Sequence, residues 1–131
     1  MIVDSNGVLI VPESGDAQIK LNPREKTLYL FFLRHPEGIA PDALVGHRNE
    51  LLWIYKTFTI FDDEIAIEGS IDSLLEEDKK ALYTNVSRIN SKIKTKIGEI
   101  TSKPYMLRFI YRTGLYQIDV ASESIRWDIN L

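Results

Sequence analysis

The chain has 131 residues, of which 44% are hydrophobic and 10% aromatic; this is enough for one core but short for two ordinary domains, so we expect residues 1–131 to form a single domain. The absence of cysteine excludes disulfides, thiolate zinc sites and cysteine nucleophiles. The net charge is −3, the acidic start lacks the basic residues of a signal peptide, and no apolar run approaches the roughly 20 residues of a membrane-spanning helix, so we expect a cytoplasmic protein without a membrane partner.

Residues 1–21 alternate short apolar runs with turn signals, of which Ser5-Asn6-Gly7 is the clearest. Asn-Gly between apolar runs is a strong hairpin signal because both residues tolerate a positive φ. We therefore predict a small N-terminal antiparallel sheet of about three strands.

Residues 22–97 are predicted to form a helical core. Asn22-Pro23-Arg24-Glu25 combines a capping residue, a proline at the first helical position and a glutamate at the third, so a helix should start there. This helix should end near His35-Pro36, and Pro41 should start a second, short helix. A further helix is predicted from one apolar stripe with helical spacing: Leu51, Ile54, Tyr55 and Phe58.

An acidic insertion follows at residues 59–78, and its isoleucines and leucines favour a packed loop with a short helix near residues 70–75. The longest helical pattern spans residues 78–97, where Gly98 is placed to end it. Its apolar residues fall within about 80° of the helix circumference: Leu82, Val86, Ile89, Ile93 and Ile97. Residues 101–131 then read as a β-hairpin around Thr113-Gly114 and a tail that either adds a closing strand or packs Trp127 on the core.

Charge is strongly segregated along the chain. Residues 62–78 hold eight acids and no base, whereas residues 79–112 hold nine bases and one acid, Glu99. A basic segment inside an acidic protein is the electrostatic footprint that phosphate backbones require. The other interpretation is a solvated helix face that the adjacent acidic segment neutralises. Charge alone leaves both open.

Two stretches resemble the OmpR/PhoB family of winged helix-turn-helix effector domains. Leu21-Asn22-Pro23-Arg24-Glu25, with the apolar helix and proline-glycine turn after it, is similar to the opening helix of that family. Val86-Ser87-Arg88-Ile89-Asn90-Ser91-Lys92-Ile93 is similar to its recognition helix, and Arg112-Thr113-Gly114-Leu115-Tyr116 to its wing. The resemblance implies an α+β winged helix with an N-terminal antiparallel sheet, three to four helices and a C-terminal β-hairpin wing, here expected to stand alone without a receiver domain.

The same resemblance implies a sequence-specific DNA-binding module, a transcriptional regulator that reads the major groove of double-stranded DNA with the helix 78–97. In this interpretation Arg88 could pair with guanine and Asn85 with adenine, while lysines suit phosphates. The expected contacts comprise a helical set and two wing residues: Asn85, Arg88, Ser91, Lys92, Thr95, Lys96, Arg112 and Thr113.

A second class of function stays open: a winged-helix protein-interaction module without DNA binding. The acidic segment 62–78 is its best support, since it could bind a protein partner or cover the basic helix of its own or a neighbouring subunit, in a homodimer or an autoinhibited regulator. We expect no enzyme, because His35 and His47 suit capping or surface positions and no nucleophile motif is present. Asp62-Asp63-Glu64 lacks the spacing of a calcium loop, so neither a metal nor a cofactor is expected.

Overall fold

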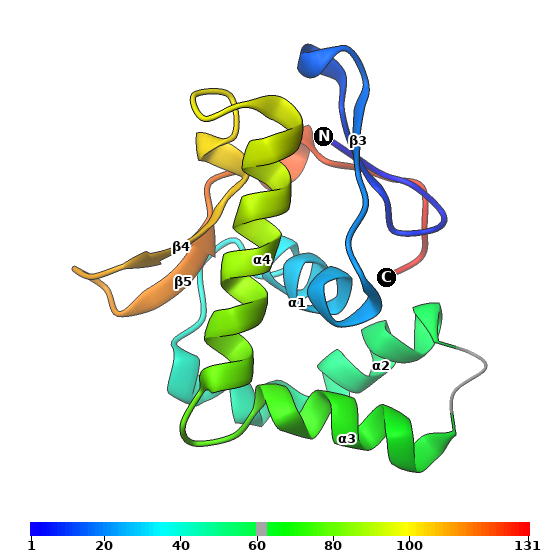
Figure 1. Cartoon of the computed structure of the whole chain (residues 1–131), viewed down its shortest axis with the longest axis vertical. Helices are drawn as coiled ribbons and strands as arrows, with labels where there is room; N and C mark the ends of the chain where they lie inside the picture. The colour runs from blue at the N-terminus through cyan, green and yellow to red at the C-terminus, as the bar shows by residue number, and fades with distance from the viewer. Residues whose placement is uncertain (60–62) are drawn as a thin grey trace.

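The structure, a computed structural model, describes residues 1–59 and 63–131, so Asp62 of the predicted acidic segment lies outside the described residues. The described part is α+β, with four α-helices, a small mixed sheet and a C-terminal β-hairpin (Figure 1). The coarse class predicted from sequence is therefore confirmed. None of the described helices is long and apolar enough to span a bilayer.

The N-terminal sheet has the strand order β3-β2-β1-β6 and joins both ends of the chain. β1 (Ile2–Val3) pairs antiparallel with β2 (Leu9–Val11) across the predicted Asn6-Gly7 turn, and β3 (Ala17–Ile19) follows after a 3-10 turn, η1 (Pro12–Ser14). β6 (Arg126–Trp127) lies parallel to β1. The sheet is thus mixed rather than purely antiparallel, because the tail adds its strand from the far end of the chain.

The first helix, α1 (Pro23–Leu33), begins with the predicted capping box: Glu25 N donates to Asn22 Oδ1 at 2.9 Å, and Asn22 N donates to Glu25 Oε1 at 3.0 Å. Every residue of α1 after Lys26 is buried, so this helix is the centre of the core. Figure 1 shows it behind α4 and between the sheet and the remaining helices.

A 3-10 segment, η2 (Pro41–His47), leads directly into α2 (Arg48–Phe58), whose predicted apolar stripe faces the core. The acidic insertion differs from the prediction of a loop with a short helix. It forms a three-turn helix, α3 (Glu64–Leu74), because Asp63 Oδ1 accepts from Ala66 N at 2.8 Å and Ile67, Ile71 and Leu74 repeat on one buried face.

The longest helix, α4 (Lys80–Ile97), starts two residues later than predicted because Asp78 stays outside it and accepts from Lys80 N at 3.0 Å. Leu82, Val86, Ile89 and Ile93 are buried as the spacing predicts, and Gly98 ends the helix with a φ of 89°. α4 runs across the front of the molecule and leaves its outer side open (Figure 1).

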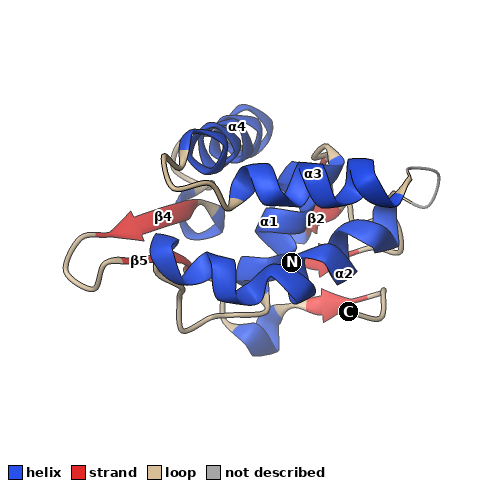
Figure 2. Ribbon diagram, turned by 90° about the horizontal axis from the view of Figure 1, so that it is seen from below, coloured by secondary structure: helices blue, strands red, loops and turns tan. Residues whose placement is uncertain are grey.

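After the 3-10 turn η3 (Lys103–Tyr105), β4 (Leu107–Ile110) and β5 (Leu115–Ile118) form the predicted hairpin, with Leu107 opposite Ile118 and Ile110 opposite Leu115. The hairpin projects away from the body in both views (Figures 1 and 2). A bridge between Ile39 and Tyr116 ties β5 to the segment that joins α1 and α2. The tail, which includes η4 (Ser122–Ser124), meets both expectations, since it adds β6 and packs Trp127 against the core.

Candidate nucleic-acid interface

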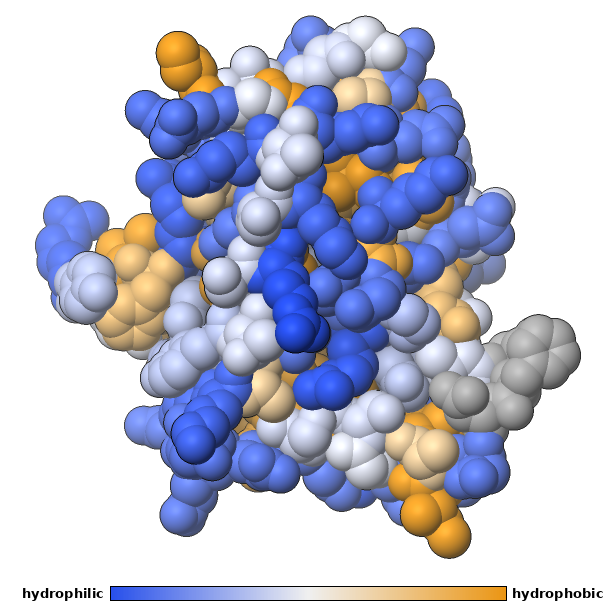
Figure 3. Space-filling model, viewed as in Figure 1, coloured by the Kyte–Doolittle hydropathy of each residue, from blue (hydrophilic) through white to orange (hydrophobic). Residues whose placement is uncertain are grey.

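The outer side of α4 presents most of the residues that the sequence assigned to DNA. Arg88, Ser91 and Thr95 are exposed and follow one another at helical spacing, with Thr84 one turn before Arg88. The surface seen from this side is mainly hydrophilic (Figure 3). The fold therefore leaves one guanidinium among hydroxyl groups on a helix face that nothing in the described chain covers.

The structure corrects the placement of Asn85. Its side chain is only 4% exposed, and Asn85 Nδ2 donates to the Ala81 carbonyl oxygen at 2.7 Å. Asn85 lies at the border of the buried stripe, where the amide can satisfy a backbone carbonyl instead of meeting solvent. Its amide is not displayed for pairing with adenine, contrary to the expectation.

Lys92 is also less available than its helical position suggests. Its ammonium forms an ion pair with Glu25 Oε1, and the Glu25 side chain is 0% exposed. Glu25 belongs to the capping box of α1, so Lys92 neutralises a buried carboxylate that the helix start requires. Lys92 therefore has a structural role, and a DNA phosphate would have to compete with the Glu25 carboxylate for its ammonium group.

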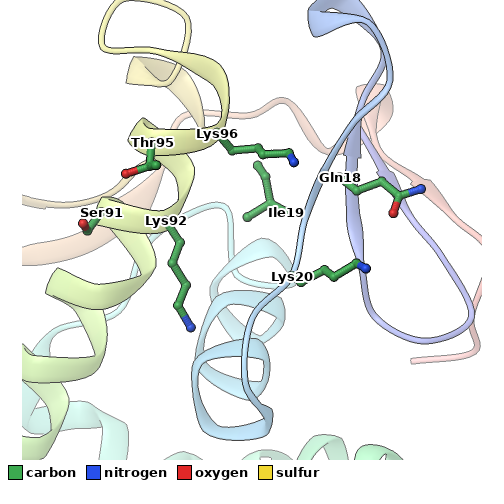
Figure 4. Close-up of a pocket in the computed structure, with 7 residues that line it drawn as sticks. All are labelled: Gln18, Ile19, Lys20, Ser91, Lys92, Thr95 and Lys96. Atoms are coloured by element: carbon green, nitrogen blue, oxygen red, sulfur yellow. The ribbon is translucent and has the colours of Figure 1, made fainter.

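A groove of about 480 Å³ lies between β3 and α4. Lys96 extends across it toward β3, and Lys92 points down toward α1 (Figure 4). Ser91 and Thr95 also line this groove, although their hydroxyl groups point away from β3 (Figure 4). Four residues of the predicted polar face thus border the groove, namely Ser91, Lys92, Thr95 and Lys96. Arg88 is exposed on the same helix.

The tip of the hairpin carries both predicted wing residues, Arg112 and Thr113, and both are exposed. Gly114 has a φ of 73°, a left-handed conformation that closes the turn and that side-chain-bearing residues rarely adopt. Tyr111, which was not among the predicted contacts, is 90% exposed beside Arg112 and meets Phe109 edge to face with ring centroids 5.1 Å apart. Its signal was a tyrosine two positions before the predicted turn at Thr113-Gly114.

Asn90 fixes the hairpin against α4, a role that the sequence did not reveal. Leu107 N donates to Asn90 Oδ1 at 2.8 Å, and Asn90 Nδ2 donates to the Leu107 carbonyl oxygen at 2.9 Å. This pair of bonds caps the first residue of β4 as another strand would. The hairpin and the outer face of α4 are therefore held in one geometry.

Ion pairs separate the basic groups into engaged and open ones. Lys79 pairs with Asp42 at 2.8 Å, and this hydrogen bond raises the pKa of Lys79. Lys94 lies 3.8 Å from Glu99. Within residues 1–59 and 63–131, five basic side chains on α4 or the β4-β5 hairpin form no ion pair: Lys80, Arg88, Lys96, Arg108 and Arg112.

The acids of α3 are engaged on α2 rather than on α4. Glu64 Oε1 lies 2.8 Å from Lys56 Nζ, and Asp72 Oδ1 lies 2.7 Å from Arg48 Nε. Glu68 is 3.7 Å from the same arginine. Of the two interpretations of the charge pattern, neutralisation of the basic helix by the acidic segment therefore has no support among the described ion pairs.

Comparisons of the chain with protein-family models, with curated proteins and with solved structures find no match.

Proposed function

We propose that the chain is a winged-helix module that binds double-stranded DNA in a sequence-specific manner and acts in transcriptional regulation. The observation that carries this proposal is Arg88, which is exposed in the middle of the hydroxyl-bearing face of α4 and has no ion pair within the described residues 1–59 and 63–131. Lys96, Arg108 and Arg112 add positive charge on the same helix and on the hairpin fixed to it. A positive face of this kind on an acidic chain favours a phosphate-bearing partner.

The order of the elements supports a winged helix as the architecture behind this face. α1, the bridging segment at Ile39, the helices that follow and the β4-β5 hairpin come in the order that the OmpR/PhoB resemblance implies. In such folds the last helix enters the major groove and the hairpin contacts the adjacent backbone. α4 and the hairpin are the corresponding elements in this chain.

We assign base contacts and phosphate contacts to different side chains of this surface. Arg88 has the fork geometry to pair with the O6 and N7 atoms of a guanine, and Ser91 and Thr95 can reach neighbouring base edges or phosphates. Lys96 and Arg112 suit phosphate oxygens on either side of the groove. Asn85 has no part in this proposal because its amide is buried.

The test is a binding titration of the tag-free chain with a mixed-sequence duplex at about 50 mM and 200 mM salt, followed by selection of bound sequences from random duplexes. Each phosphate contact should steepen the fall of log K with log salt by about 0.9. We expect binding at low salt, a slope of about two to four contacts from the open basic residues, and an enriched motif containing guanine. Absence of binding at the lower salt would contradict the proposal.

A protein-interaction module is the second candidate, and one observation favours it. Ile65 on α3, within the acidic segment, is 84% exposed, and Trp53 on α2 is 44% exposed. Exposed apolar side chains near charged ones are typical of surfaces that bind another protein, including a second copy in a homodimer. Sedimentation of the parent and of Ile65→Glu tests this: self-association that the substitution abolishes would support it.

A further inference from the structure

Both histidines of the chain lie together with one carboxylate, although they are twelve positions apart. His35 follows the last turn of α1, His47 ends η2, and Glu50 lies in the first turn of α2. One ligand atom from each of the three lies within 4.8 Å of the other two. We propose that His35, His47 and Glu50 form a binding site for one Zn²⁺ ion, independent of the proposed DNA binding.

The distances are close to those of a tetrahedral zinc site. His35 Nε2 lies 2.9 Å from Glu50 Oε1, and His47 Nδ1 lies 3.9 Å from the same oxygen. Zinc bonds of about 2.0–2.2 Å at tetrahedral angles place ligand atoms about 3.3–3.5 Å apart. The observed values lie on both sides of this spacing, so small rotations of the side chains would bring the ligands to an ion. Water would complete the fourth position.

Glu37 contacts the His35 ring on the side away from Glu50 and can fix its tautomer. His35 Nδ1 lies 3.0 Å from Glu37 Oε1, so both nitrogens of this ring face carboxylate oxygens. A neutral imidazole has one N–H and can donate to only one of them. When Nδ1 donates to Glu37, the lone pair of Nε2 faces Glu50, and a cation between them satisfies both. A carboxylate that holds the distal nitrogen of a metal-bound histidine is a recurrent feature of zinc sites.

The surroundings hold the ligands but leave access from solvent. The buried Phe31 ring packs against both imidazoles, with centroid distances of 4.5 Å to His35 and 5.2 Å to His47. The side chains of His35, His47 and Glu50 are 19%, 32% and 22% exposed. Arg34 donates to Glu50 Oε2, which also lies 3.0 Å from His35 Nε2. Oε1 is therefore the oxygen near both histidines that we assign to the ion, and Arg34 adds a positive charge nearby. We therefore expect weaker binding than at a closed four-ligand site.

The ion would link the end of α1 to the start of α2 without entering the main core. The apolar core around α1 does not depend on these three side chains. The protein should thus fold without zinc and become more stable when zinc is bound, because a ligand that binds only the folded state shifts the equilibrium toward it.

The experiment uses the full chain without an affinity tag, first stripped with a chelator. We expect calorimetry to show one equivalent of Zn²⁺, and Co²⁺ to give the visible absorption of a tetrahedral site. His47→Gln and Glu50→Gln should each weaken zinc binding at least tenfold, while circular dichroism checks that the variants fold. Glu13→Gln, which removes an exposed carboxylate on η1, is the matched control and should bind as the parent does.

Glu37 would position the His35 imidazole rather than bind the ion, so its test needs a measurement that reports on the His35 ring. Glu37→Gln should weaken zinc about tenfold, and in the parent the ¹⁵N shifts of His35 should show a metal-bound Nε2 and a protonated Nδ1. Two results would overturn the inference: no binding of Zn²⁺ at millimolar concentration, or binding that His47→Gln and Glu50→Gln leave unchanged.

Discussion

α3 and α4 are adjacent in the chain and opposite in charge, and they differ in whether their charged side chains form ion pairs with the rest of the molecule. The acids of α3 reach back to α2, where Glu64 meets Lys56 and Asp72 meets Arg48. Arg88 and Lys96 on α4 have no carboxylate partner in the described part of the chain. Neighbouring segments of opposite charge therefore do not neutralise each other here. The acids of α3 form ion pairs with α2, whereas Arg88 and Lys96 of α4 are accessible to a binding partner.

Lys92 on α4 pairs with a buried carboxylate, and changing it has the largest effect that we expect. Lys92→Ala removes the partner of the buried Glu25 carboxylate and should lower the free energy of unfolding by about 1–3 kcal/mol. Lys96→Ala on the same helix should cost less than about 0.5 kcal/mol, because alanine is a good helix former and Lys96 is exposed. Urea denaturation measures both.

A second substitution tests whether the unpaired Glu25 carboxylate causes the loss of stability in Lys92→Ala. Glu25→Gln in the Lys92→Ala background should recover part of the loss, because the neutral amide no longer needs a counter-charge. Equal stability of Lys92→Ala and Lys96→Ala would mean that the pair with Glu25 contributes nothing, and that Lys92 belongs with the open lysines.

Removing the negative charges of α3 tests whether its acids weaken the binding of DNA to α4. Glu64, Glu68 and Asp72 are paired with α2, so changing all three to their amides should alter affinity for duplex DNA by less than about threefold at physiological salt, where charges are screened beyond about 8 Å. Anisotropy titrations measure this. A gain of about tenfold or more would place the acidic helix beside bound DNA and restore autoinhibition as an explanation.

The smallest expected effect concerns the pair between α2 and α3. The hydrogen bond from Arg48 lowers the pKa of Asp72 below its ordinary value. A lowered carboxyl pKa favours the folded state above the pKa of the unfolded chain, and this contribution disappears as the pH falls through the folded value. Since the pair is at the surface, Arg48→Ala should barely change overall stability but should return the pKa of Asp72 toward normal in an NMR titration. An unchanged titration would show that Asp72 does not hold Arg48.

Much of the local structure could be predicted because its signals are local. The capping box at Asn22, the turn at Asn6-Gly7 and the buried stripe of α4 each depend on residues within a few positions of one another. The sequence also contains the signals for the full length of α3, since Asp63 is a capping residue and Ile67, Ile71 and Leu74 have helical spacing. The prediction nevertheless confined the helix to about residues 70–75.

The parts that escaped prediction depend on contacts between distant residues. Glu25 and Lys92 are 67 positions apart, so neither position alone showed that the lysine was engaged. β6 joins β1 from the opposite end of the chain, which no local pattern could specify. His35 and His47 looked like separate surface residues until η2 brought them together with Glu50. Asn85 was assigned to the polar side because a helical wheel does not show which border residues turn inward.

The most direct measurement of the central claim compares Arg88→Ala with Arg126→Ala in binding to the duplex selected by the parent. Each variant removes one exposed arginine side chain, but Arg126 is paired with Asp128 and lies on β6, at the sheet edge opposite the strand that contacts α4. We predict that Arg88→Ala weakens binding about 5- to 150-fold and relaxes preference at one base position. Arg126→Ala should stay within about twofold of the parent, because distant surface charges are screened. Equal effects of the two variants would contradict the assignment of α4 as the DNA-reading helix.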